Sequence, residues 1–287
     1  MSNISFDLSG KIDQRTIDAL TLVKDVADSL AIRFFIVGAT ARDLILEHRY
    51  GIRSPQMTKD IDLGVEIEDW QQFERLKKTL LSTAKFRTAA EAHRLFFDSL
   101  PIDMVPFGEV SGKKGRISWP PEHGIFMNLV GLKEAFEFAL TVRLSTVPDL
   151  VIKLPSLPGL ALLKIISWRD GYPTRKRDAG DLLLIMEKYD EAGNVDRLYG
   201  KEQDLLTEEG FDMRKAAIRL LGRDMGALAY PDTLAFVRAI LDEEIGAHSQ
   251  YRLVADMIRE TSNPDADFDA ILSQLVKLRQ GLNEKSL

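Results

Sequence analysis

The segment 59–67 constrains the fold more than any other, because apolar and polar residues alternate along it. Four apolar residues occupy every second position: Ile61, Leu63, Val65 and Ile67. A period of two predicts a β-strand with one buried face. Asp60 and Asp62 lie between these positions. Successive strand side chains point to opposite faces, so both carboxylates point away from the core on the same face of the predicted sheet.

Apolar patterning predicts the remaining elements. Short runs rich in β-branched and aromatic residues predict strands at 33–37, 95–97, 102–107, 138–144 and 150–154. Helical spacing predicts helices at 13–29, 41–48, 70–81, 157–169 and 176–189, and then near 211–222, 231–246, 249–261 and 266–280. Residues 108–124, rich in Gly, Pro and Lys, predict a loop. We therefore predict an α+β fold, in which 1–155 form a short mixed β-sheet with flanking helices and 156–287 form an all-helical domain.

Composition excludes several kinds of chemistry. The 287 residues include no cysteine, which excludes thiol catalysis and cysteine-ligated metals. The four histidines have no paired spacing that suggests a metal site. A net charge of −6 argues against broad electrostatic binding to nucleic acid. The sequence shows no signal peptide and no apolar stretch that could cross a membrane, so we expect a cytoplasmic protein without membrane partners.

Three aspartates are the candidate metal ligands. Two neighbouring carboxylates such as Asp60 and Asp62 repel each other unless a cation lies between them, and Mg²⁺ prefers oxygen ligands. Asp103 lies in an apolar, strand-like run, where a lone carboxylate is costly unless it is paired or binds metal. Asp98 and Asp69 compete for this third role, but we expect Asp98 at a hairpin turn and Asp69 at a helix N-cap. If the two strands are neighbours, Asp60, Asp62 and Asp103 could hold two ions for a phosphoryl displacement.

The turn Gly38-Ala39-Thr40 is the candidate phosphate site. It follows a predicted strand and precedes a predicted helix, where backbone N–H groups and the helix dipole favour an anion. Gly38 permits the tight turn, Ala39 is small, and the Thr40 hydroxyl could donate to a phosphate oxygen. Such a turn alone is common, and its interest comes from the aspartates that follow it.

Taken together, these motifs resemble the DNA polymerase β-like nucleotidyltransferase superfamily. The resemblance lies in Val37-Gly38-Ala39-Thr40-Ala41-Arg42-Asp43, Lys59-Asp60-Ile61-Asp62-Leu63 and Ile102-Asp103-Met104. The Arg42-Asp43 pair is also similar to the turn of tRNA CCA-adding enzymes. Ala39 stands where that family usually has a second glycine, and its methyl group narrows the phosphate site.

Two later segments resemble the AbiEii-like toxins, the nucleotidyltransferases of type IV toxin–antitoxin systems. These segments are Leu160-Ala161-Leu162-Leu163-Lys164 and Arg175-Lys176-Arg177-Asp178-Ala179-Gly180-Asp181-Leu182. The resemblance implies that Lys164 and Lys176 neutralise the triphosphate, while Asp178 and Asp181 orient them or touch the base. The helical domain would then close one side of a nucleotide cleft beside the catalytic domain.

The resemblance also implies an activity and its components. The enzyme would transfer a nucleoside monophosphate from an NTP to a hydroxyl, use two Mg²⁺ ions with Mn²⁺ as a substitute, and release pyrophosphate. The implied catalytic residues are Asp60, Asp62, Asp103, Lys164, Lys176 and Asp178. The implied nucleotide-binding residues are Gly38, Ala39, Thr40, Arg42, Lys59 and Asp181. The acceptor would be the 3′ end of tRNA, and a cognate antitoxin would neutralise the toxin.

Two alternatives remain open. The acceptor could be a small molecule such as an aminoglycoside, or a protein hydroxyl, because an acidic chain also suits a cationic substrate. A non-catalytic nucleotide-binding module is the third hypothesis, although a module that only binds has no need of Asp103. His93 and Arg94, just before a predicted strand, could reach substrate, but we favour their interpretation as surface residues. Four aromatic residues could stack a base, but we favour packing in the core or at an interface: Trp119, Phe126, Trp168 and Tyr172.

Overall fold

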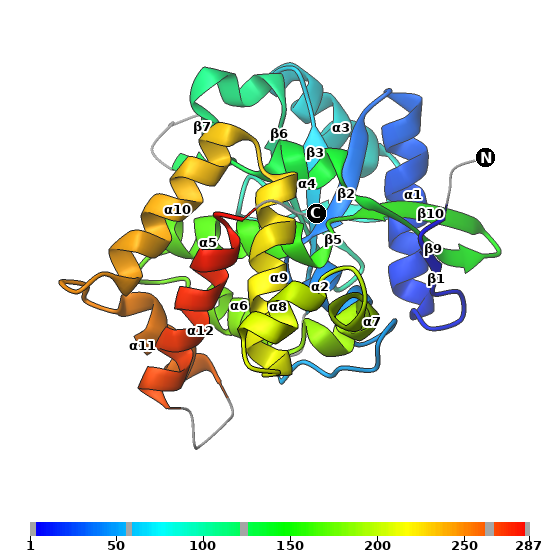
Figure 1. Ribbon diagram of the computed structural model, residues 1–287. Helices are drawn as coiled ribbons and strands as arrows, with labels where there is room; N and C mark the ends of the chain where they lie inside the picture. Colours follow the sequence, from blue (N-terminus) through cyan, green and yellow to red (C-terminus); the bar gives the residue numbers. More distant parts are fainter. Residues whose placement is uncertain (1–3, 56–58, 121–125, 262–266, 285–287) are drawn as a thin grey trace. The chain divides into compact units, whose positions relative to one another are not determined.

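The computed structural model describes residues 4–55, 59–120, 126–261 and 267–284, with the side chains of residues 113 and 114 left aside. The chain divides into two compact units, Met1–Ser156 and Leu157–Leu287. The first contains the sheets and the second is helical (Figure 1). Among the described residues, no helix has both the length and the apolarity that a membrane span requires.

A five-stranded mixed sheet forms the centre of the first unit. Its strands, in spatial order, are β2 (Arg33–Val37), β3 (Ile61–Glu66), β6 (Leu100–Phe107), β5 (Arg94–Phe97) and β4 (Phe86–Thr88). The β3–β6 pair is parallel, and the other neighbours are antiparallel. Ile61, Leu63 and Val65 are buried as their alternation predicts. The predicted α+β class with a short mixed sheet is confirmed.

The helices of this unit begin at polar caps or tight turns. They are α1 (Gln14–Ser29), α2 (Gly38–Leu46), α3 (Trp70–Ser82) and α4 (Leu132–Glu137). Asp13 and Asp69 accept hydrogen bonds from the first turns of α1 and α3, which confirms Asp69 as an N-cap. Helix α2 begins at Gly38, three residues before the prediction, so the Gly38-Ala39-Thr40 turn is its first turn. Helix α4 was not predicted.

Two small sheets complete the first unit. One contains β1 (Phe6–Asp7), β9 (Leu140–Thr146) and β10 (Asp149–Leu154), so the two late strands are confirmed with small shifts. The other pairs β7 (Arg116–Ser118) with β8 (Phe126–Asn128), after a 3-10 helix at Glu109–Lys114. The predicted loop at 108–124 is therefore wrong for its described part, because Gly108 and Gly115 flank the 3-10 helix and Gly112 lies at a kink inside it. Its residues 121–123 and Gly124 lie outside the described residues.

The second unit is a set of packed helices. They are α5 (Leu157–Gly171), α6 (Arg177–Glu187), α7 (Val195–Tyr199), α8 (Gln203–Glu208), α9 (Met213–Leu228), α10 (Pro231–Ile245), α11 (Arg252–Glu260) and α12 (Phe268–Gly281), with a π-helical turn at Asp190–Asn194. The sequence predicted no element between 189 and 211. The helices there are too short to show a helical period in the apolar residues. Helices α9 and α12 approach closely: a Cβ on Gly281 would lie 2.0 Å from the Arg219 carbonyl oxygen.

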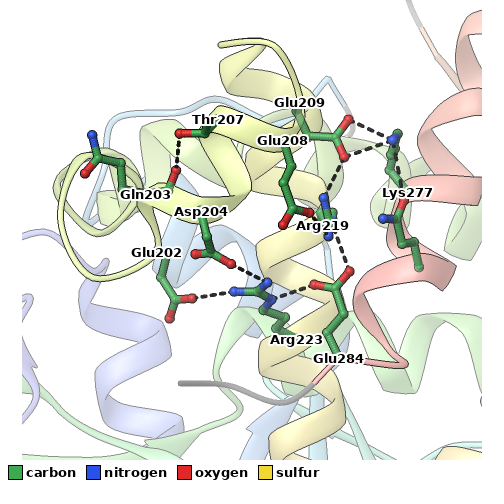
Figure 2. A network of polar contacts seen from close by, with 11 residues as sticks. Glu202, Gln203, Asp204, Thr207, Glu208, Glu209, Arg219, Arg223, Lys277 and Glu284 are labelled. Carbon is green, nitrogen blue, oxygen red and sulfur yellow. Dashed lines mark hydrogen bonds and ion pairs between the residues drawn. The ribbon is translucent and has the colours of Figure 1, made fainter.

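An ion-pair network joins α8, α9 and the segment after α12 (Figure 2). Arg219 and Arg223 on α9 are almost fully buried. Each places its Nε on one carboxylate oxygen of Glu284, at 2.7 and 2.6 Å. Their remaining nitrogens pair with acids on or beside α8: Glu202, Asp204, Glu208 and Glu209. This network fixes the end of the described chain to the helical unit.

Candidate active site

The three predicted aspartates lie at one end of the β3–β6 pair. Asp62 and Asp103 are register partners on these parallel strands, and neighbouring strands lie about 4.8 Å apart. Asp60 immediately precedes β3. Asp103 is buried, with 8% of its surface exposed, whereas Asp60 and Asp62 are partly exposed. The structure therefore brings together the three carboxylates that the sequence singled out. Asp98 lies at the β5–β6 turn, as expected, with a φ of 52°.

The first turn of α2 lies directly against Asp62. Val37, the N-cap of α2, is the register partner of Asp62 in the β2–β3 pair. Gly38 has a φ of +68°, which favours glycine. A Cβ at Gly38 would lie 2.0 Å from Oδ2 of Asp62, so a larger residue would displace this carboxylate. Val37, the N-cap residue of α2, makes no side-chain cap hydrogen bond, and backbone N–H groups at a helix start favour an anion.

Thr40 and Arg42 have partners within the fold. The Thr40 hydroxyl donates to the Asp60 backbone carbonyl oxygen at 2.7 Å, which joins α2 to the start of β3. Arg42 is 1% exposed, and its guanidinium pairs with Asp43 at 2.6 Å. Sequence reasoning assigned both residues to the nucleotide. In this structure Thr40 positions the Asp60 segment, and Arg42 has almost no surface to offer a ligand.

Arg94 is the residue that sequence reasoning missed. It is the register partner of Asp103 in the antiparallel β5–β6 pair. Its Nε and Nη2 donate to the two oxygens of Asp103 at 2.6 and 2.7 Å, and Nη2 lies 3.4 Å from Oδ2 of Asp60. These hydrogen bonds to Asp103 raise the pKa of Arg94, against the opposing effect of burial. Arg94 is thus a cation between two of the three acids, and its interpretation as a surface residue is wrong.

His93 lies beside the same carboxylate. Its Nε2 is 4.0 Å from Oδ2 of Asp103, and its ring packs against Trp119 at 5.4 Å. Trp119 and Trp168 are buried, so the packing prediction is confirmed for both. Phe126 is 70% exposed, so it does not pack in the core, and its packing at an interface stays a prediction. Tyr172 is half-exposed and contacts Trp168 edge-on.

A cavity of about 450 Å³ adjoins Asp60 within the first unit. Its lining includes Thr40 from α2, the start of α1 and the residues around the aspartate. Positively charged or basic side chains contribute to the lining: Lys11, Arg15, His48 and Lys59. Lys59 is exposed and adjacent to Asp60, so it is available to an anionic ligand beside the acids.

Lys164, Asp178 and Asp181 form a buried ion cluster within the helical unit. The Lys164 ammonium lies 2.9 Å from Oδ1 of Asp178 and 2.5 Å from Oδ2 of Asp181. Burial alone would lower the pKa of Lys164, but the charges of the two aspartates outweigh it and raise this pKa. Oδ2 of Asp178 accepts no hydrogen bond but lies 3.2 Å from Nε of Arg175. The cluster joins α5 to α6.

Lys176 does not belong to that cluster. Its ammonium lies 4.0 Å from Asp256 on α11, and 38% of its side chain is exposed. Asp256 is buried and accepts a hydrogen bond from the Trp168 indole at 3.1 Å. The sequence suggested that Asp178 and Asp181 orient both lysines. The structure shows this contact for Lys164, and places Lys176 at the start of α6 with a different partner.

Carboxylate oxygens make Asp60, Asp62 and Asp103 the natural holders of a hard divalent ion. Within the described residues, no group of three acidic or histidine side chains is already arranged to hold a metal. The contacts of Arg94 give a physical reason, because its guanidinium takes the oxygens of Asp103 and approaches Asp60. The oxygens of these aspartates suit a cation, and in this structure the positive charge beside Asp60 and Asp103 is the guanidinium of Arg94.

The fold and its family define the class of protein: an α+β nucleotidyltransferase. The family described as "Nucleotidyl transferase AbiEii toxin, Type IV TA system" matches residues 21–274, and the chain belongs to this family. The resemblance seen in the sequence and the enzyme class it implied are both confirmed.

Several solved structures are similar to this chain at low identity. The antibiotic-resistance factor ANT(2'')-Ia shares 11% identity over 69% of this chain and 98% of its own, with a TM-score of 0.35. A CCA-adding enzyme with CTP shares 17% over 94% of this chain and 68% of its own, also with a TM-score of 0.35. At such values these likenesses say nothing about the substrate of this chain. No curated protein matches the sequence.

Proposed function

We propose that this nucleotidyltransferase depends on a divalent metal and transfers a nucleoside monophosphate from an NTP to a hydroxyl acceptor through Asp60, Asp62 and Asp103. The observation that supports it is the pairing of Asp62 with Asp103 on parallel strands, with Asp60 reached by the same arginine that binds Asp103. Asp103 comes from a segment about 40 residues after Asp60 and Asp62, and it lies beside them in the fold at one end of the sheet. Phosphoryl transfer needs them there.

The aspartates would hold Mg²⁺, as two ions, with Mn²⁺ as a substitute. The bound metal would supply positive charge that offsets the charge on the phosphate oxygens. Asp103 would accept the proton of the attacking hydroxyl. The hydroxyl oxygen forms a bond to the α-phosphorus, the bond from that phosphorus to the bridging oxygen breaks, and pyrophosphate leaves with the electron pair.

The start of α2 would receive the triphosphate. Gly38 and Ala39 offer backbone N–H groups in the first turn of α2, and Lys59 adds an exposed positive charge beside Asp60. In the helical unit, the side chain of Lys176 is 38% exposed. Lys164 and Asp178, which the sequence counted as catalytic, and Asp181 would instead support the local helix arrangement, because all three are buried against one another.

We propose the tRNA 3′ end as the acceptor, and a toxin role neutralised by a cognate antitoxin. Membership of a type IV toxin–antitoxin family supports this proposal. Growth arrest on expression, relieved by substitution of Asp62, is the expected cellular result.

The test is label transfer from each of the four α-labelled NTPs to total RNA or to an aminoglycoside, with Mg²⁺, Mn²⁺ or a chelator. We expect transfer to RNA with metal only, and its loss in Asp62→Asn. Asp98→Asn is the matched control, since Asp98 is exposed at a turn that asparagine also tolerates. Full transfer by Asp62→Asn would overturn the catalytic proposal, and label on the aminoglycoside alone would overturn the RNA acceptor.

A further inference from the structure

Arg94 forms ion pairs with two of the three aspartates of the candidate active site, Asp103 and Asp60. Its side chain is 28% exposed and that of Asp103 is 11% exposed, so the pair is largely shielded from water. Two parallel hydrogen bonds from a guanidinium to one carboxylate form the strongest common geometry for such a pair. The contact with Asp60, at 3.4 Å, is longer and weaker.

These contacts use the oxygens that a metal would need. Each oxygen of Asp103 and Oδ2 of Asp60 already accept a hydrogen bond from Arg94, so a divalent ion bound by the same carboxylates competes with the guanidinium for their negative charge. A guanidinium stays protonated at any ordinary pH, so it cannot make room by losing its charge. Like charges also repel, so a metal ion on Asp103 and the guanidinium of Arg94 weaken each other's contact with that carboxylate.

We propose that Arg94 is a built-in counter-cation that competes with the divalent metal for Asp60 and Asp103. In this role, which rests on the proposed function, Arg94 is a positioning residue. It keeps the buried carboxylate of Asp103 paired while no metal is bound, and it releases that carboxylate when metal enters. The wild-type protein therefore binds metal more weakly than its three aspartates alone would.

The test measures Mn²⁺ binding to the full-length protein without nucleotide, by calorimetry and by the electron paramagnetic resonance signal of free Mn²⁺. Arg94→Gln removes the charge and keeps a shorter, polar side chain. We expect it to bind Mn²⁺ about tenfold or more tightly than wild type, because a charged hydrogen bond no longer has to be broken. Arg94→Lys, which keeps the charge without the two-pronged geometry, should fall between them.

Arg87→Gln is the matched control. Arg87 lies on β4 of the same sheet, is exposed, and donates to the backbone of Asp98, away from the three acids. Its Mn²⁺ affinity should equal that of wild type. Circular dichroism confirms that each variant is folded, and Arg94→Lys carries the test if Arg94→Gln does not fold. Mn²⁺ should also raise the melting temperature of Arg94→Gln more than that of wild type.

Three outcomes separate the inference from the function on which it rests. Equal or weaker Mn²⁺ binding by both Arg94 variants, together with loss of binding in Asp62→Asn, overturns the competition and leaves the metal site standing. Tighter binding by the Arg94 variants that Asp62→Asn abolishes supports both. Absence of Mn²⁺ binding in every variant, with label transfer unaffected by chelator, overturns the metal dependence and the inference together.

Discussion

The carboxylate of Asp62 occupies the space that a side chain on Gly38 would need, with Oδ2 only 2.0 Å from the position of that Cβ. Two properties of Gly38 are therefore used at once, its positive φ and its lack of a side chain. The first turn of α2 is proposed to receive the phosphate, and it also contacts Asp62, which is proposed to hold the metal.

Gly38→Ala should therefore lose activity beyond its loss of stability. The left-handed backbone costs about 1–2 kcal/mol for any larger residue. Displacement of Asp62 should lower kcat/KM by about 100-fold in addition. Gly10→Ala separates the two effects, because Gly10 has a φ of +79° and open space around its Cβ. Equal activity in the two variants, measured by label transfer at matched folded fractions, would show that the contact with Asp62 is unimportant.

The buried Lys164 cluster should make Lys164→Met strongly destabilising. Removing the ammonium leaves Asp178 and Asp181 side by side in a buried site without their shared cation. Loss of one partner from a buried ion pair costs about 3–5 kcal/mol. The side chain of Lys176 is 38% exposed and lies 4.0 Å from Asp256. Lys176→Met should therefore lower the free energy of unfolding by no more than about 1 kcal/mol. Urea unfolding of both variants makes the comparison, and similar midpoints would contradict it.

Asp204 should make stability depend on acidic pH. Its hydrogen bond from Arg223 lowers its pKa below the ordinary 3.8, against the opposing effect of burial. A carboxyl with a lowered folded-state pKa stabilises the fold above its unfolded pKa, and this contribution is lost as the pH falls through the folded pKa. Asp204→Asn should therefore be less stable than wild type near neutral pH, and the difference should shrink below pH 3.8. Unfolding free energies that differ by a constant amount across this range would refute the assignment.

The close approach of α9 and α12 should make Gly281→Ala destabilising. The new methyl group would meet the Arg219 carbonyl 2.0 Å away, and the two backbones would have to separate. Overpacking of this kind costs about 1–3 kcal/mol. Gly226→Ala on α9 is the control, since its Cβ would lie 3.3 Å from the nearest atom and alanine favours a helix. A melting temperature for Gly281→Ala at or above that of Gly226→Ala would contradict the packing argument.

The local pattern at 59–67 was enough to predict β3 and the shared face of Asp60 and Asp62, because a period of two is a local property. Arg94 escaped prediction because its contact depends on register. Pro101 suggested a turn, since proline rarely lies inside a central strand. In the structure β6 begins at Leu100 and pairs with β3 only from Ile102, so Pro101 lies where β5 is the neighbouring strand.

The register itself would have revealed the missing partner. Phe97 pairs with Leu100 across a turn of Asp98 and Ser99, and counting outward from that turn places Arg94 opposite Asp103. The burial of Arg42 and the separation of Lys176 from Lys164 could not be reached in this way. Both depend on packing between elements, which a helical or strand period does not report.

The β5–β6 pair also bears on the order in which the protein acquires its structure. Strands β5 and β6 are joined by a tight turn, whereas the parallel β3–β6 pair must wait for α3, β4 and β5 to be placed between its members. Short-range pairings generally form faster than long-range ones. We therefore expect Asp103 to pair with Arg94 before it pairs with Asp62. The carboxylate of Asp103 would then already have a positively charged partner when the three aspartates come together.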